Sequence, residues 1–473
     1  MRELEKIYNR IVQRVNINLR ELNFDVTPFA DQLIPPDQMT KFYAFYGITP
    51  DHPLDLHFHH SALAGSYFLG RCRVSNSLLY KSDIRGDELK REKQIFRFEN
   101  FEIVLATDEM ISIENSALVK TLVHNFSHDP ETVEKFFIKD TLAMDYSNIH
   151  GAPSGGCFLG PFATVDLTTV RDCAIGCYSY VQAGEISHMN IAPGTIWVNS
   201  PGNFNFLYTY PEQPLAQYVS LSPEYVPWGI LFDFIEEHKD AFQRVFDFVN
   251  LDAIESIPNT ASLDHFAVVL PRTKIEDNVL VAQRAYIENS TLGRGANAQE
   301  NCFIINSHLE GLNVTAHGAK IVNANMGRGI FTGFNSFLFG KPESRLTVGK
   351  GSIIMPHTII DINEPLTVPE DHLVWGLVRN GNELAENSIP LEELTKVKSS
   401  FSRGRLHFEG KGDLFVKTFQ DRIHHILEAN GAFYEDGKNA GHAQRNQNLS
   451  LNTIQPFHFG EKKGMYPDIQ IRP

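Results

Sequence analysis

A short phrase recurs at a constant interval in the middle of the chain. It begins with isoleucine, carries asparagine at its third position and ends in leucine or methionine, at 287–292, 304–309 and 321–326. Self-similarity at a short fixed period is typical of repeat architectures, in which each unit packs only against its neighbours. This repeat constrains the fold more strongly than any other feature of the sequence.

Apolar residues recur inside each period after six, six and five positions, as in Ile275, Val281, Ile287 and Leu292. Three short strands per coil explain this spacing. Stacked coils would lie about 4.8 Å apart, as neighbouring strands do in a sheet, and one aliphatic side chain per strand would fill the interior. A helix would need a period of about 3.6 residues, which these segments lack. We therefore expect a parallel β-helix with triangular coils.

One corner of the expected coils carries the same polar residue in each repeat. Asn289, Asn306 and Asn323 occupy equivalent positions. Stacked asparagine side chains can bond to one another and to the backbone of turns. We expect these three residues to form a ladder that belongs to the scaffold.

Further coils lie outside this central block. The phrase with asparagine at its third position returns at 74–79 and 113–118, and the alternation of five and six positions between apolar residues runs from Leu159 to Ile191. We expect the β-helix to begin near residue 60, to be interrupted, and to continue to about residue 362.

Apolar residues at helical spacing predict helices elsewhere in the chain. These helices are expected at 3–22, 223–249 and 412–429, and over 119–142, where Asp129 would begin a second helix. The chain then divides into an N-terminal helical segment (1–55), first β-helix coils with a helical insertion (56–200), a helical insertion (201–262), the main β-helix stack (263–380), a C-terminal helical extension (381–435) and a flexible tail (436–473).

Charge and composition restrict the partners of the chain. The formal net charge of −15 over 473 residues argues against nucleic acid or an anionic membrane surface as the main partner. No run of about 18 apolar residues is present, so we expect no membrane span. The five cysteines are scattered and odd in number, which does not suggest a disulfide framework, and we expect a cytoplasmic, reducing location.

The coil residues resemble those of the hexapeptide-repeat superfamily of left-handed β-helix proteins. The resemblance rests on the positions from Leu159 to Ile191 and from Leu270 to Ile360, and the segment from Val368 to Val378 looks like the usual exit from such a helix. It covers about half of the chain. It implies a mainly β fold, a left-handed parallel β-helix, to which this chain adds helical insertions and terminal helices.

The same resemblance implies an activity. Most members are homotrimeric acyltransferases that take an acyl group from a thioester, commonly acetyl-coenzyme A or acyl carrier protein. The acceptor would be the hydroxyl or amine of a small molecule, here a sugar or sugar nucleotide. A histidine at a coil corner usually serves as the general base, and no metal is expected.

The candidate site residues follow from the repeat. His317 lies two residues past Thr315 at a corner, and Glu300 holds the same corner one coil earlier, so the two side chains should lie about one strand spacing apart. A carboxylate beside an imidazole orients the ring and raises its basicity. His308 aligns with residues 291 and 325 of the adjacent coils and is a candidate base or acceptor-binding group. We predict His317, Glu300 and His308 as the catalytic residues; the residues that bind the cofactor are not identified.

Two other functions are compatible with a β-helix. The stretch from Asn313 to Gly318 resembles the surroundings of one metal-binding histidine in gamma-class carbonic anhydrases, but 318–322 lacks the second histidine expected there. A metal site would need other ligands, such as His308 with His317. A non-catalytic scaffold is the third possibility, because the insertion at 192–262 would either build a pocket or block one.

Overall fold

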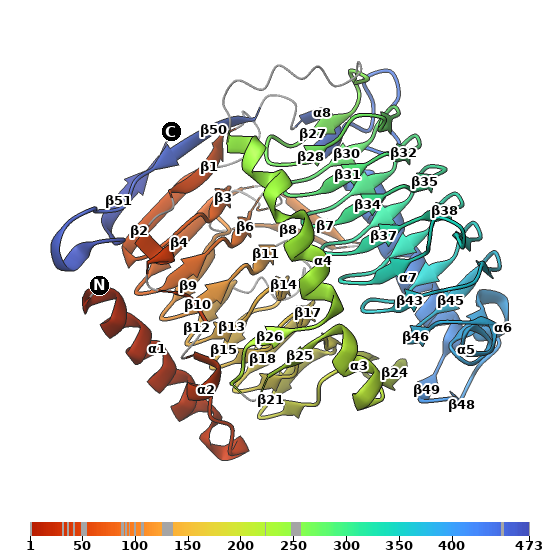
Figure 1. The fold of residues 1–473 in the computed structure, drawn as a ribbon, viewed down its shortest axis with the longest axis horizontal. Helices are drawn as coiled ribbons and strands as arrows, with labels where there is room; N and C mark the ends of the chain where they lie inside the picture. Colours follow the sequence, from red (N-terminus) through yellow and green to blue (C-terminus); the bar gives the residue numbers. More distant parts are fainter. Residues whose placement is uncertain are drawn as a thin grey trace. The chain divides into compact units, whose positions relative to one another are not determined.

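The computed structural model describes most of the chain (Figure 1). The described residues are 2–124, 136–246, 257–445 and 449–472, with further gaps at 31–32, 36, 41–42, 49–53, 87–88, 90–91, 94, 99–100, 106–107 and 223. They fall into two compact units, each of them a parallel β-helix. The first comprises Met1–Thr195, Glu212–Ile230 and Leu449–Pro473, and the second comprises Ile196–Pro211 and Leu231–Asn448.

Regular coils stack in the later part of the first unit. Strands β14 (Asn148–His150), β17 (Thr164–Asp166) and β20 (Tyr180–Gln182) pair in parallel, so that Ile149, Val165 and Val181 align. All three of these middle residues are fully buried. Since successive side chains of a strand point to opposite faces, the flanking residues of each strand point out of the coil.

The main stack of the second unit follows the period that the repeat predicts, and each of its coils is one residue longer than those just described. Strands β31 (Tyr286–Glu288), β34 (Phe303–Ile305), β37 (Lys320–Val322) and β40 (Phe337–Phe339) align Ile287 with Ile304, Ile321 and Leu338. These four side chains belong to one continuous apolar core. The predicted three strands per coil are confirmed, because the coil residues alternate among three parallel sheets.

The asparagine corner is present, but its hydrogen bonds are not all alike. Asn289, Asn306 and Asn323 all adopt left-handed backbone conformations, with φ of 43°, 48° and 50°, a region that asparagine tolerates better than most residues. Asn289 Nδ2 donates to Asn306 Oδ1 at 2.8 Å. Asn323 Nδ2 instead donates to the backbone carbonyl of Gly340 on the following coil, at 3.0 Å.

Several predicted helices are confirmed. Helix α1 (Arg2–Leu19) packs across one sheet of the first unit, with Leu4, Ile7 and Ile11 in a core shared with strand residues such as Leu142. Helix α7 (Gly412–Ala429) matches the expected C-terminal helix. Helix α4 (Ile230–His238) and the 3₁₀ segment η3 (Lys239–Phe246) lie within the predicted helical region at 223–249, although Pro227–Trp228 forms a strand there.

One of the predicted helices is wrong. Residues 119–142 contain strands instead: β10 (Ala117–Val119), β11 (Leu122–His124), β12 (Phe137–Lys139) and β13 (Leu142–Ala143). The helix expected to begin at Asp129 lies outside the described residues. Short apolar runs fit a strand or a helix equally well, and here the stacking of coils decides.

The tail, expected to be flexible, is ordered where the structure describes it. Strand β50 (Ser450–Ile454) pairs antiparallel with β1 (Ala44–Ile48), and β51 (Tyr466–Ile471) pairs antiparallel with β2 (Asp55–Ser61). The β-helix therefore begins before residue 60, inside the segment expected to be helical. The polar composition of 436–473 hides its role, which is to pair with the edge strands of the first coil.

Other segments mix strands with helices. The region expected as a helical insertion at 201–262 also holds strand β24 (Phe204–Thr209), and the extension at 381–435 holds the hairpin of β48 (Ser400–Arg403) and β49 (Leu406–Gly410). Strand β24 pairs with β49 inside the second unit.

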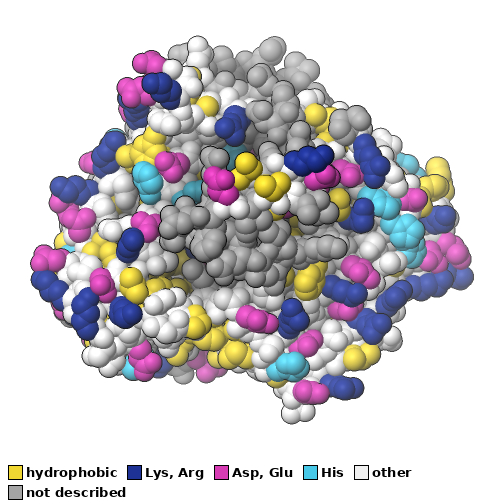
Figure 2. Space-filling view, turned by 180° about the vertical axis from the view of Figure 1, so that it is seen from behind, with side chains coloured by type: hydrophobic (Ala, Val, Ile, Leu, Met, Phe, Trp, Pro, Cys, Tyr) yellow, Lys and Arg dark blue, Asp and Glu magenta, His cyan; other side chains and the backbone are white. Residues whose placement is uncertain are grey.

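The described residues include no helix with the length and apolarity that a membrane crossing requires. Acidic and basic side chains are interspersed over the described part of the face in Figure 2.

Candidate active site

The predicted pair of Glu300 and His317 forms in the second unit. His317 lies in the turn between β36 (Val314–Thr315) and β37, and Glu300 lies in the same turn of the preceding coil. His317 Nδ1 and Glu300 Oε2 are 2.7 Å apart, and both side chains are buried. The structure thus shows the expected contact, whereas the catalytic role remains a prediction.

The contact with Glu300 determines what the imidazole of His317 can do. With Nδ1 next to the carboxylate, a proton on Nδ1 would be held there, and the lone pair of Nε2 would be available to accept a proton or to bind a metal. The ring also lies 5.2 Å from the ring of Phe334 on the next coil, measured between centroids. Glu300 and Phe334 therefore contact the imidazole of His317 on two sides.

A buried lysine lies three residues after His317. Lys320 Nζ donates to the carbonyl of Gly318 at 2.5 Å and lies 5.9 Å from the ring centroid of Phe303. Burial among these groups lowers the pKa of Lys320 to about 7, because a low-dielectric surrounding penalises the charged amine. This strongly perturbed group is close in the sequence to the predicted base, but nothing in the repeat pattern identifies it.

His308 lies on a different side of the coil. It belongs to β35 (His308–Leu309), where it aligns with Thr291 and Asn325 as predicted, and it is exposed. In a triangular coil this sheet is opposite the corner that holds Glu300 and His317. The structure therefore brings two of the three predicted residues together and places the third elsewhere.

The first unit carries a buried polar surface that the sequence analysis missed. It is the outward face of the sheet that contains β14, β17 and β20, and we call it the polar face. Although they point out of the coil, most of its side chains are buried. Its members are Asp83, Arg85, His124, Asn148, His150, Thr164, Asp166, Tyr180 and Gln182.

A second histidine and carboxylate pair lies at the centre of the polar face. His150 Nδ1 is 2.8 Å from Asp166 Oδ1, and Asp166 is completely buried. Tyr180 Oη donates a short hydrogen bond to the other carboxylate oxygen, Asp166 Oδ2. Tyr180 Oη also lies 2.9 Å from Gln182 Oε1. Asp166 thus orients the imidazole of His150, and Tyr180 in turn holds Asp166 in place.

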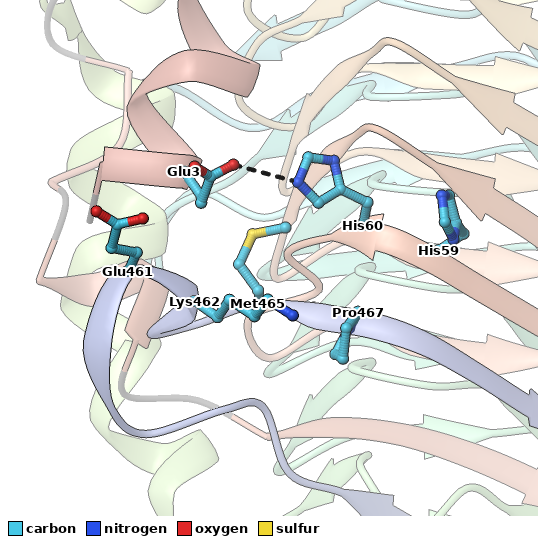
Figure 3. A pocket seen from close by; sticks show the side chains of 7 residues that line it. All are labelled: Glu3, His59, His60, Glu461, Lys462, Met465 and Pro467. Atoms are coloured by element: carbon cyan, nitrogen blue, oxygen red, sulfur yellow. Dashed lines mark ion pairs between the residues drawn. The ribbon is translucent and has the colours of Figure 1, made fainter.

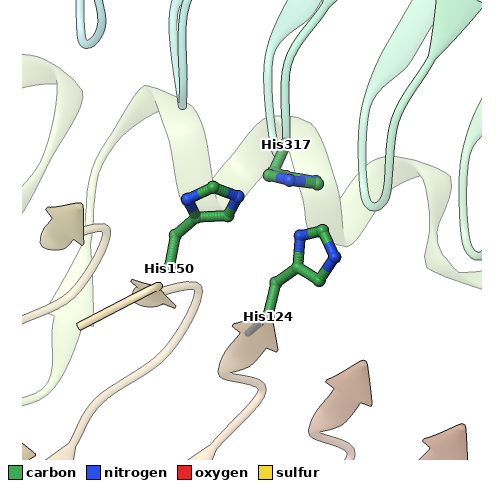
Figure 4. Close-up of side chains that lie close together, drawn as sticks. All are labelled: His124, His150 and His317. Carbon is green, nitrogen blue, oxygen red and sulfur yellow. The ribbon is translucent and has the colours of Figure 1, made fainter. Parts of the chain in front are cut away.

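His124 lies beside His150. The two residues align across β11 and β14, and their rings meet edge to face with centroids 5.0 Å apart (Figure 4). Figure 4 also labels His317, which belongs to the second unit. The sequence period predicts the alignment of His150 with Asp166, because these residues directly follow the aligned Ile149 and Val165. The sequence period does not continue from His124 to His150, so no such signal identifies His124.

A more open pocket lies at the beginning of the first unit. It has a volume of about 420 Å³ and is lined by Glu3, His59, His60, Glu461, Lys462, Met465 and Pro467 (Figure 3). His60 Nε2 lies 3.5 Å from Glu3 Oε2, and the neighbouring His57 pairs with Asp468 at 2.8 Å. These pairs are partly exposed to solvent, and such ion pairs are weak. They are partly exposed counterparts of the two buried pairs, His317 with Glu300 and His150 with Asp166.

Comparisons with known proteins agree with the fold. The family described as hexapeptide repeat including loop matches residues 101–223. The crystal structure of a candidate acetyltransferase from Desulfovibrio desulfuricans G20 is 48% identical to this chain, with a TM-score of 0.93. The match covers 100% of this chain and 99% of that one. Curated protein sequences give no significant match. The chain therefore belongs to the hexapeptide-repeat superfamily of left-handed parallel β-helix proteins.

Proposed function

We propose that the protein is an acyltransferase that moves an acyl group from a thioester donor to a hydroxyl or amine of a small acceptor. The observation that carries this proposal is the buried pair of His317 and Glu300 at a coil corner, 2.7 Å apart. The similarity to a candidate acetyltransferase at 48% identity over the whole chain supports the same reaction class.

In the proposed reaction His317 is the general base. Its Nε2 takes the proton of the acceptor O–H or N–H while the oxygen or nitrogen attacks the carbonyl carbon of the thioester. The tetrahedral adduct collapses with cleavage of the C–S bond, and the imidazolium returns its proton to the departing thiolate. Glu300 holds the ring in the required tautomer and stabilises the imidazolium while it exists.

The proposed donor and acceptor rest on the resemblance to hexapeptide-repeat acyltransferases. We propose acetyl-coenzyme A or an acyl carrier thioester as the donor and a sugar or sugar nucleotide as the acceptor, with a homotrimer as the working assembly. His308 remains a candidate for binding the acceptor, on a face of the coil that is exposed.

The proposal is tested by measuring thiol release from acetyl-coenzyme A with a panel of sugar and sugar-nucleotide acceptors. Loss of a positioned general base costs about 10²- to 10⁴-fold in rate, so His317→Ala should lose that much. Glu300→Gln should lose less, because the base itself remains. Equal rates for wild type and His317→Ala with the best acceptor would overturn the assignment of His317.

The chain offers a matched control for this experiment. His407 and Glu409 also form a histidine and carboxylate pair in the second unit, at 2.9 Å, but both side chains are about half exposed to solvent. His407→Ala removes the same chemical group from a solvated position. It should retain the wild-type rate, which separates loss of the buried base from general effects of removing a histidine.

A further inference from the structure

We propose that His124 and His150 bind a divalent transition-metal ion on the polar face of the first unit. The two residues occupy equivalent positions of strands β11 and β14, which pair directly. Each ring offers one nitrogen, and these two nitrogens lie within 4.8 Å of one another. Imidazole is a ligand that zinc, copper, iron and nickel all accept, so the site would take an ion of this class.

The distance between the rings suits a shared ion after small side-chain rotations. Zinc-to-nitrogen bonds are about 2.0–2.1 Å long, so two imidazole nitrogens on one ion lie at most about 4.2 Å apart. The backbone already supplies the alignment, because neighbouring strands of a sheet are held about 4.8 Å apart. Binding therefore requires rotation of the two imidazoles and no change of register.

The hydrogen bonds around His150 are those expected of a metal ligand. The contact of its Nδ1 with Asp166, at 2.8 Å, leaves Nε2 as the nitrogen for the ion. Metal-bound histidines almost always donate their other nitrogen to a carboxylate, carbonyl or water, which fixes the ring and raises its basicity. Asp166 accepts a hydrogen bond from Tyr180 in turn, so the carboxylate that orients this ligand is itself held in place.

The charges of the polar face also favour a cation. It carries two carboxylates, Asp83 and Asp166, and one guanidinium, Arg85, all of them buried. A buried carboxylate is costly unless a positive charge compensates it. A divalent ion between His124 and His150 would supply that charge close to Asp166. Two protein ligands would leave coordination positions for water or for an oxygen of a substrate. This proposal departs from the sequence-based expectation that no metal is needed.

The decisive experiment uses the full chain freed of metal and titrated with Co²⁺ and Zn²⁺. Cobalt bound by nitrogen ligands gives visible absorption bands, and elemental analysis after dialysis gives the stoichiometry of zinc. We expect about one ion per chain in the wild type, and a loss of at least tenfold in affinity in His124→Gln and in His150→Gln. Asp166→Asn should weaken binding about 10- to 100-fold, as loss of an outer-shell partner does.

A surface histidine provides the matched control. His57 pairs with Asp468 at the same distance as His150 with Asp166, 2.8 Å, but in a partly exposed position. His57→Gln should bind the ion like the wild type. Circular dichroism and the melting temperature without metal show whether each variant folds. Less than about 0.1 ion per folded wild-type chain would overturn the proposal, and so would equal affinity in wild type and both buried-histidine variants. These readouts need no acyl donor, so they are independent of the proposed transferase reaction.

Discussion

The two β-helices of this chain have the same interior and different outer faces. In both, fully buried aliphatic residues fill the coil, such as Val165 in the first unit and Ile304 in the second. In the first unit the outer face of one sheet carries the polar face described above. In the second unit outward positions of one sheet hold rings such as Phe303 and Phe337, which pack against Phe234 of helix α4 at centroid distances of 5.3 and 5.8 Å.

In both units the interior residues specify the fold, whereas the outward residues can differ without changing it. A short strand needs only its middle side chain for the core. The flanking side chains can carry chemistry, as at His150 and Asp166, or can anchor a helix, as Phe303 does. Both units nevertheless contain a buried imidazole beside a carboxylate, on a strand face in the first unit and at a corner in the second.

We expect the largest loss of stability when the polar face of the first unit is disrupted at Asp166. Asp166→Ala would leave the His150 imidazole and the Tyr180 hydroxyl without their shared acceptor inside the protein. Leaving a buried hydrogen-bonding group without its partner costs about 1–3 kcal/mol for each group. Denaturant unfolding should show this loss in the free energy of unfolding. Asp468→Ala breaks the surface contact with His57 and should cost about 1 kcal/mol or less; equal losses in the two variants would contradict a structural role of the polar face.

The next effect concerns the buried amine of Lys320 in the second unit. Lys320 loses its proton near a pKa of about 7 in the folded protein but at about 10.4 in the unfolded chain. Between these values the unfolded chain binds more protons, so the free energy of unfolding rises with pH, by up to about 1.4 kcal/mol per pH unit. Lys320→Met removes this contribution.

The measurement is urea unfolding of both proteins at several pH values from about 7 to about 9. The advantage of Lys320→Met over the wild type should be greatest near pH 7 and should shrink as pH rises. Other titrating groups are common to both proteins and cancel in the difference. A difference that does not change with pH would mean that Lys320 keeps its proton in the folded state.

The smallest effect tests whether the two interiors are equivalent. Ile149→Val in the first unit and Ile304→Val in the second each remove one methylene from a fully buried position. Each should cost about 0.5–1.5 kcal/mol. Melting of the two variants measures this, with Ile17→Val as a control at a half-exposed position of α1. Costs that differ by more than about 1 kcal/mol would show that the shorter coils of the first unit and the longer coils of the second are not packed equally well.

The sequence predicts the interior far better than the rest. The spacing of Ile275, Val281, Ile287 and Leu292 is enough to derive three strands per coil, because inward-facing residues recur once per strand. The expectation of a helix over 119–142 is wrong because the period that identifies coils elsewhere in the sequence is broken there. The interruption breaks the period, and the short apolar runs on either side then carry no register.

The candidate site is predictable only where it follows the period. Glu300 and His317 are one coil apart, and the structure places them in contact. His124 and His150 are not one period apart in the sequence, so their alignment depends on pairing that no spacing reveals. The period predicts an outward, exposed position for Lys320, and its burial depends on packing against residues of other strands.

The pairing of β50 and β51 with the first coil has a consequence for biosynthesis. Strand β1 ends at Ile48, but its antiparallel partner begins only at Ser450. Ribosomes add about 5–20 residues per second, so the edge of the nascent first coil waits roughly 20–80 s for its partner. During that interval it presents unpaired backbone groups that another nascent chain could pair with. Strands β50 and β51 thus complete a coil that is synthesised long before them.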